Sequence, residues 1–197
     1  MPRLLVLVVA CAACSWLSPR PDRTRFYVLA AVPPEVDPPP VAQPLVGLGP
    51  IALPPYLERP QLVTRLAQNE LRISEGEQWA EPLNRGFARV LARDVELALG
   101  PGSVVLFPWP RSAAPRWSVS IDVQRFERLA VGEVELTARW TLRDAKSGEV
   151  LVASDESIRD RMRDQSGEAA VAALSRALAA LGQNIVRAQS RLNRGGP

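Results

Sequence analysis

The two cysteines are the residues whose position points most directly to chemistry. Cys14 directly follows the small residues Ala12 and Ala13, at the end of an apolar run that begins at Leu4. A short positive start, an apolar stretch and small residues before a cleavage point are the features of an export signal. The run is too short to cross a membrane, which takes about 20 apolar residues. We therefore expect residues 1–13 to be removed as a signal peptide, which leaves Cys14 at the new N-terminus.

Small residues before a cysteine resemble the lipobox of bacterial lipoproteins, in which the cysteine is acylated. Cys14 is the favoured lipidation site because it keeps the longer apolar core, and Cys11 is the alternative. An ordinary secretory signal with incidental cysteines is a further interpretation, but the chain has no other cysteine for a disulfide framework. Stable anchoring takes more than one acyl chain, and the three chains of a bacterial lipoprotein would hold this protein on its membrane. In bacterial lipoproteins, an Asp directly after the acylated cysteine is the signal for retention in the inner membrane. Here that residue is Ser15, which favours the outer membrane.

The residues needed for most catalytic chemistry are missing. The chain contains no histidine, which removes the commonest general base and the usual metal ligand. It has neither a GxxxxGK[ST] run nor a GxGxxG run, so we expect no bound nucleotide and no cofactor. Carboxylates such as Asp155 and Glu156 could do acid–base work, but acids among many arginines are more often a solvated surface. We predict that the protein is not an enzyme; an envelope hydrolase that uses acids alone is the remaining catalytic hypothesis.

The basic residues indicate a membrane neighbour rather than a nucleic acid. Only Lys146 among the 24 basic residues is a lysine, and the formal net charge is +3. Such an Arg-, Ala- and Pro-rich composition more often reflects coding bias than a nucleic-acid surface, and an exported protein meets no nucleic acid. Arg20, Arg23 and Arg25 follow the expected anchor and could rest on anionic head groups, each contributing about 1 kcal/mol. We therefore expect no nucleic-acid partner.

The 197 residues, nearly half of them hydrophobic, suffice for one domain. Residues 14–25 form a lipidated tether that spans only a few tens of ångströms when extended, at about 3.3 to 3.6 Å per residue. The domain itself is expected over residues 26–192, with a stiff Pro-rich loop at 33–44. Residues 193–197 are expected to be a loose tail. The domain must therefore work close to its membrane.

Hydrophobic periodicity predicts the elements of the domain. Strands 117–123 and 133–143 alternate strictly, so one face of their sheet is apolar and the other wet, and with 149–157 they should form an antiparallel meander. The last helix has apolar steps of three and four, which suits a coiled-coil seam or, as we favour, a cover for the apolar sheet face. We predict an α+β single domain with a largely antiparallel sheet covered by two helices on one face. The predicted strands are 26–29, 45–53, 61–65, 70–74, 104–107, 117–123, 133–143 and 149–157, and the helices are 81–99 and 166–192.

Several blocks of sequence, in this order, resemble the PqiC (YmbA) family of ABC-type transport auxiliary lipoproteins. The longest of them is YLERPQLVTR, and WAEPL follows some fourteen residues later. The likeness runs from Phe26 to about Ile158, while the last helix matches only in kind. The blocks are Gly47–Pro54, Tyr56–Arg65, Trp79–Leu83, Phe107–Trp109, Ile121–Phe126 and Ala138–Leu142.

The resemblance implies a function that composition alone does not. Members of the family are outer-membrane lipoproteins of Gram-negative bacteria that accompany MCE-domain proteins and their permeases, in systems thought to move phospholipids or other lipids between the two membranes. The resemblance implies a non-catalytic subunit on the periplasmic face of the outer membrane. This subunit docks on an MCE protein as a homo-oligomeric ring and supports membrane integrity. The alternative is a lipid-binding periplasmic carrier that acts without a permanent transporter complex.

Two residues of the matching blocks are candidates for a partner interface. Tyr56 and Arg59 lie in the block YLERPQLVTR, and the aromatic residues Trp79 and Trp109 belong to the later blocks. For the aromatic residues among them, core packing is the favoured interpretation, as is usual for an aromatic in an amphipathic domain. Arg59, between an acidic residue and a proline, has a structural ion pair as its competing role.

Overall fold

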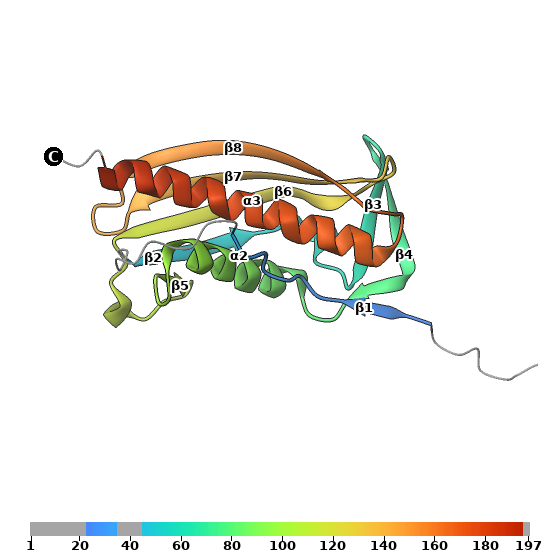
Figure 1. Ribbon diagram of the computed structural model, residues 1–197, viewed down its shortest axis with the longest axis horizontal. Helices are drawn as coiled ribbons and strands as arrows, with labels where there is room; N and C mark the ends of the chain where they lie inside the picture. The colour runs from blue at the N-terminus through green and yellow to red at the C-terminus, as the bar shows by residue number, and fades with distance from the viewer. Residues whose placement is uncertain (1–22, 35–44, 195–197) are drawn as a thin grey trace, which may run out of the picture.

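The computed structural model describes residues 23–34 and 45–194 of the chain, as one domain in which a sheet is covered by two long helices (Figure 1). Our predictions for the signal peptide, Cys14, Cys11 and most of the Pro-rich loop lie outside these residues. The strands are β1 (Arg25–Tyr27), β2 (Val46–Ala52), β3 (Gln61–Ala67), β4 (Glu70–Trp79), β5 (Val104–Leu106), β6 (Trp117–Leu129), β7 (Glu133–Asp144) and β8 (Val150–Arg161), and the helices are η2 (Pro55–Leu57), α2 (Leu83–Leu99), η3 (Arg111–Ala113) and α3 (Gly167–Arg194).

Strand β6 is the strand to which most of the sheet attaches. Along one edge it pairs antiparallel with β7, which pairs antiparallel with β8. Along its other edge the first half of β6 pairs with β2 and its last residues pair with β3, both in parallel. The hairpin of β3 and β4 is antiparallel, whereas β1 joins β4 and β5 joins β2 in parallel. The predicted α+β domain, its meander and its hairpin are confirmed; most paired residues lie in antiparallel ladders, and the parallel pairings make the sheet mixed.

The covered face of the sheet follows the alternation seen in the sequence. Every second residue of β6 from Trp117 to Val123 is buried, and so are the β7 partners of the last three, Leu142, Trp140 and Ala138. The register then shifts between Val123 and Arg125, which is the signature of a β-bulge. Beyond it Phe126 is buried against Phe87 of α2, with ring centroids 5.1 Å apart. The bulge thus keeps apolar side chains on the covered face although the sequence parity changes.

Both helices cover the same face of the sheet (Figure 1). Helix α3 is long and apolar enough to cross a membrane by length and composition, but most of its apolar window is buried inside the domain, as in a core helix. Its packing on the sheet confirms the favoured interpretation of its apolar seam. The fully buried side chains between the layers include Phe87, Leu91, Phe126, Leu136, Leu142, Leu178, Leu181 and Ile185.

Some element boundaries differ from those predicted. Helix α3 continues to Arg194, so residues 193 and 194 belong to the helix and not to the tail; the last three residues lie outside the described ranges. Strands β4 and β6 run on to Trp79 and Leu129, because their later residues pair although their side chains no longer alternate strictly. Strand β1 ends at Tyr27, since the chain then leaves the sheet and crosses the helices.

The segment after β1 is fastened to both helices. The backbone N–H of Ala30 donates to Ser175 Oγ at 3.2 Å, and that of Val32 donates to Asp94 Oδ1 at 2.8 Å. Leu29 between them is buried in the core. Asp94 is also buried, and its second oxygen has no hydrogen-bond partner in the described structure. Burial, opposed only in part by the Val32 hydrogen bond, raises the pKa of Asp94 to about 6.

Asp94→Asn is expected to stabilise the domain at neutral pH by about 1 to 2 kcal/mol. The pKa of Asp94 is about 6 in the folded protein against an ordinary 3.8, so the folded state binds the proton more tightly and stability falls as pH rises across that window. Asparagine keeps the acceptor for Val32 and removes the buried charge. Urea unfolding should show a clear advantage of the variant near pH 7 and little near pH 4. An advantage that is the same at both pH values would contradict this role of the charge.

Candidate functional site

The interface candidates Tyr56 and Arg59 lie in one loop, between β2 and β3. Arg59 is partly buried, and its Nε donates to the backbone carbonyl of Tyr56 at 2.8 Å. Within the described residues Arg59 forms no ion pair, so the structural ion pair considered for it is replaced by a backbone hydrogen bond that fixes the loop at the end of η2. Tyr56 is partly buried as well and packs against the core. The structure therefore gives both residues a structural contact.

Tyr56 belongs to a partly buried polar cluster on the face of the sheet opposite the helices. Its hydroxyl donates to the carbonyl of Gln124 at 3.2 Å, and the guanidinium of Arg65 lies 6.0 Å from its ring centroid. Arg65 in turn forms an ion pair with Glu127, which is fully buried. Burial, followed by the nearby Glu127 carboxylate, raises the pKa of Tyr56 to about 12. Tyr56 is therefore a neutral hydrogen-bond donor at physiological pH.

A second ion-paired cluster crosses three strands of the same face. Glu135 of β7 accepts hydrogen bonds from Arg125 of β6 at 2.8 Å and from Arg159 of β8 at 2.8 and 3.0 Å. Burial acts to raise the pKa of Glu135, but the hydrogen bonds from Arg125 and Arg159 outweigh it and lower that pKa. The prediction of a wet face is therefore wrong at Glu135, because the side chains of Arg125 and Arg159 cover its carboxylate.

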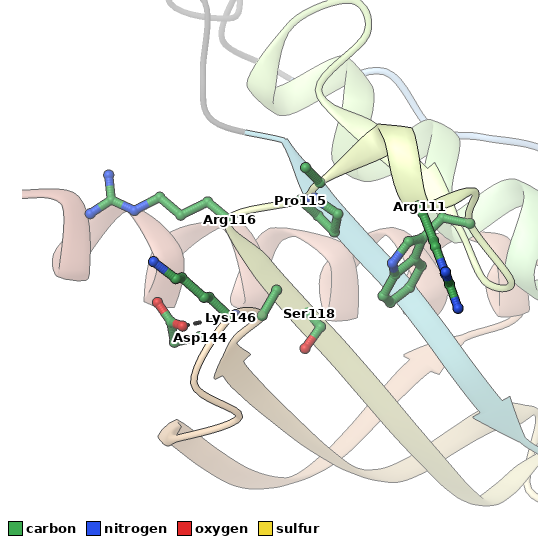
Figure 2. Close-up of a pocket in the computed structure, with 9 residues that line it drawn as sticks. Arg111, Pro115, Arg116, Ser118, Asp144 and Lys146 are labelled. Atoms are coloured by element: carbon green, nitrogen blue, oxygen red, sulfur yellow. Dashed lines mark hydrogen bonds between the residues drawn. The ribbon is translucent and has the colours of Figure 1, made fainter.

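A hollow of about 550 Å³ lies at one end of this face. Its walls come from the loop that contains η3, from the start of β6 and from the turn between β7 and β8 (Figure 2). We name it the Trp109 hollow. The residues used below are Trp109, Arg111, Arg116, Ser118, Asp144 and Lys146.

Gly47 of β2 makes room for the aromatic wall of the Trp109 hollow. A Cβ atom on Gly47 would lie 2.8 Å from Cη2 of Trp109 and 3.1 Å from Cγ of Pro115. Gly47 pairs with Ser118 of β6, so the indole ring lies beside the first residues of that strand. The ring of Phe107 meets Trp109 edge-on, with centroids 5.5 Å apart. Trp109 is thus a partly exposed wall, and not the core aromatic that sequence reasoning favoured.

The Trp109 hollow carries an excess of positive charge. Asp144 Oδ1 accepts hydrogen bonds from the backbone N–H groups of Ser147 at 2.7 Å and Lys146 at 2.9 Å. These contacts, the Ser147 ones first, lower the pKa of Asp144 and occupy its carboxylate within the turn. Arg116 lies over the Trp117 ring, 4.7 Å from its centroid. Arg111 and Lys146 form no ion pair with any described residue, so their charges are available to an anionic group.

Gly47→Ala is expected to displace the Trp109 ring and to destabilise the domain by about 1 to 3 kcal/mol, as overpacking does. The change should shift the Trp109 contribution to the emission spectrum, obtained by subtracting the spectrum of a matching Trp109→Phe protein. Gly76→Ala is the matched control, because a Cβ atom there would meet nothing within 4 Å. An emission spectrum unchanged in both alanine variants would show that Gly47 does not position the indole.

In the ranges that the structure describes, no three histidine, cysteine or acidic side chains gather where they could hold a metal ion. The clusters that the fold does build are ion pairs of arginine with carboxylates and the cationic Trp109 hollow. The protein is therefore a one-domain α+β protein whose charged surfaces are suited to binding another molecule.

The chain belongs to the family described as ABC-type transport auxiliary lipoprotein component, whose family model matches residues 27–186. The family identification agrees with the resemblance seen in the sequence blocks. It establishes the protein as a lipoprotein-family component of ABC-type transport.

Solved structures share the fold. An uncharacterised protein superimposes with a TM-score of 0.68 at 19% identity, covering 83% of this chain and 97% of its own. Protein XCC0632 from Xanthomonas campestris gives a TM-score of 0.69 at 18% identity, covering 87% of this chain and 99% of its own. At these identities the likeness shows the fold alone. No curated protein matches the chain.

Proposed function

We propose that this protein is a non-catalytic accessory subunit of an MCE-type ABC transport system that moves lipids, phospholipids among them, between the inner and outer membranes. In this proposal Cys14, or alternatively Cys11, is acylated and holds the domain on the periplasmic face of the outer membrane of a Gram-negative bacterium. The protein docks on the MCE-domain protein as a homo-oligomeric ring and supports membrane integrity. The observation that carries the proposal is the family match over residues 27–186, since that family comprises auxiliary components of ABC-type transport.

The entry point of the chain supports a role close to a membrane. The described chain begins beside β1, at one end of the long axis of the domain (Figure 1). From Cys14 to Arg25 there are about eleven residues, which reach at most about 36 to 40 Å. A domain on so short a tether stays beside its bilayer, where a subunit that links a transporter to that membrane must be.

The packing between sheet and helices favours a docking subunit over the alternative lipid carrier. The side chains of Phe87, Leu91 and Leu178 fill the space where an acyl chain would have to be sheltered. A carrier would also hold its lipid in a stable complex while it crosses the periplasm. Mass spectrometry of the purified lipoprotein in mild detergent distinguishes the two functions: a stoichiometric bound phospholipid would favour the carrier, and its absence the docking subunit.

Docking is tested by purifying an affinity-tagged copy of the full lipoprotein from the envelope of cells that express the transport system. We expect the MCE-domain protein to be recovered with it, and native mass measurement of the purified lipoprotein to give a multiple of the protomer mass. Recovery of the lipoprotein alone, from cells in which the MCE protein is present, would contradict docking. A mass of one protomer would contradict the ring.

Cys14→Ser is expected to abolish lipidation and to release the protein into the soluble periplasmic fraction. Cells fed radiolabelled palmitate should label the wild-type protein and Cys11→Ser, which is the matched control, but not Cys14→Ser. The reverse pattern would assign the anchor to Cys11. Label in neither the wild type nor the control would remove the acyl anchor from the proposal.

A further inference from the structure

The Trp109 hollow lies far from the point where the chain enters the domain. Ser118, in its wall, is near the start of β6, whereas Arg128 is near the end of that strand. Nη2 of Arg128 lies 3.2 Å from a carboxylate oxygen of Glu77, and Glu77 pairs with Arg25 of β1. The ten residue-to-residue steps along β6 from Ser118 to Arg128 span about 33 Å. The hollow and the tether are therefore at opposite ends of β6.

This separation makes the anchoring membrane a poor occupant for the hollow. The tether from Cys14 to Arg25 reaches at most about 36 to 40 Å. To bring the hollow onto the bilayer, the tether would have to run back along the domain over nearly its whole extended length. With any shorter path the hollow faces away from the bilayer, toward whatever approaches from the other side.

The chemistry of the hollow selects an anionic occupant with an apolar part. Arg111, Arg116 and Lys146 line it together with Asp144, whose Oδ1 is already bonded to backbone N–H groups of its own turn. The indole of Trp109 adds a flat aromatic surface. Carboxylates presented beside an apolar or aromatic side chain would complement this wall. Charge complementarity of this kind steers a partner and fixes its orientation.

We propose that the Trp109 hollow is the docking site for an acidic segment of the periplasmic protein of the same transporter. This inference rests on the proposed function, because it names the surface through which docking occurs. Arg111 and Lys146 contact carboxylates of the segment, and Trp109 contacts an adjacent apolar side chain. The membrane tether thus joins the domain near one end of β6, and the transporter binds near the other end.

The lysine content of the chain allows a direct test. Lys146 is the only lysine among the 197 residues, so it is the one side-chain amine that a carbodiimide can join to a carboxylate, with loss of one water molecule. We treat envelopes that contain the tagged lipoprotein and its transporter with carbodiimide and identify the cross-linked peptides by mass spectrometry. We expect an isopeptide bond between Lys146 and an Asp or Glu of the MCE-domain protein. Lys146→Arg is the matched control, because it keeps the charge and removes the amine.

Charge reversal gives an independent measurement. Arg111→Glu combined with Lys146→Glu should weaken binding to the purified MCE-domain protein at least ten-fold, and the loss should shrink as salt is added. Arg161→Glu is the matched control, because Arg161 is 91% exposed at the end of β8. This control should bind like the wild type. Thermal melts of the variants confirm that each of them is folded.

The outcomes separate this inference from the function beneath it. If the MCE-domain protein copurifies with the wild type but Lys146 joins only acidic residues of another copy of this chain, the hollow is a contact between copies and the proposal is overturned. It is overturned as well if copurification survives the double reversal and Lys146 forms no isopeptide bond. If the wild type recovers no MCE-domain protein, the proposed function itself fails.

Discussion

Arg65→Met is expected to destabilise the domain by about 3 kcal/mol, which is the lower end of the range for breaking a buried ion pair. The reason is the fate of Glu127, whose side chain has no exposed surface and whose Oε2 already has no hydrogen-bond partner in the described structure. Without Arg65 the other oxygen also loses its ionic partner.

Urea unfolding measures this effect, and two further variants isolate its cause. Arg139→Met removes an arginine that pairs with Asp155 on the same face, but these side chains are 62% and 66% exposed. Solvent and salt screen such exposed pairs, which contribute little to stability, so this control should lose little. Arg65→Met with Glu127→Leu removes the orphaned charge and should recover much of the stability. Equal losses in Arg65→Met and Arg139→Met would contradict the assignment.

Phe87→Ala is expected to cost about 3 to 5 kcal/mol of folding free energy, the range for aromatic side chains truncated in a core. Phe87 of α2 has no exposed surface and meets the edge or face of Phe126 at a centroid distance of 5.1 Å. Truncation removes this aromatic contact and leaves a cavity between the helix and β6, directly beyond the β-bulge. Because the covered face is close-packed there, little of the cavity can collapse.

Chemical denaturation with and without the substitution checks the prediction. Phe26→Ala is the matched control, since Phe26 in β1 is 61% exposed and its truncation should cost less than about 1 kcal/mol. The slope of the unfolding free energy against denaturant should stay the same in both variants. Similar losses at Phe26 and Phe87 would show that the space between α2 and β6 is not the main core.

The parts of the fold that depend on local periodicity could be predicted from sequence. The alternation that begins at Trp117 and the seam of the last helix both appear in the structure as expected. The parallel pairings of β2 and β3 with β6 could not, because they join segments far apart in the chain and leave no local pattern. The bulge between Val123 and Arg125 was missed for a related reason, since strict alternation in sequence says nothing about where a strand gains a residue.

The site shows the same division. The block YLERPQLVTR pointed to Tyr56 and Arg59, and the structure brings them together in one loop. The long-range partner of Tyr56 was not predictable, because its hydroxyl donates to the carbonyl of Gln124, 68 residues along the chain. The Trp109 hollow was missed because its cations come from separate loops whose proximity only the fold creates. Trp109 itself was noticed, and the one available signal for its exposure was the pair of prolines on either side of it.

The parallel pairing of β1 with β4 has a mechanical consequence. We propose that the membrane anchors this protein through its N-terminus and that the transporter binds it at the far end of β6. Thermal movement of the two membranes then pulls on Arg25 along the direction of β1. The hydrogen bonds between β1 and β4 bear this force together, in shear, and do not break one after another. The attachment of Ala30 and Val32 to the helices passes the remaining tension into the body of the domain.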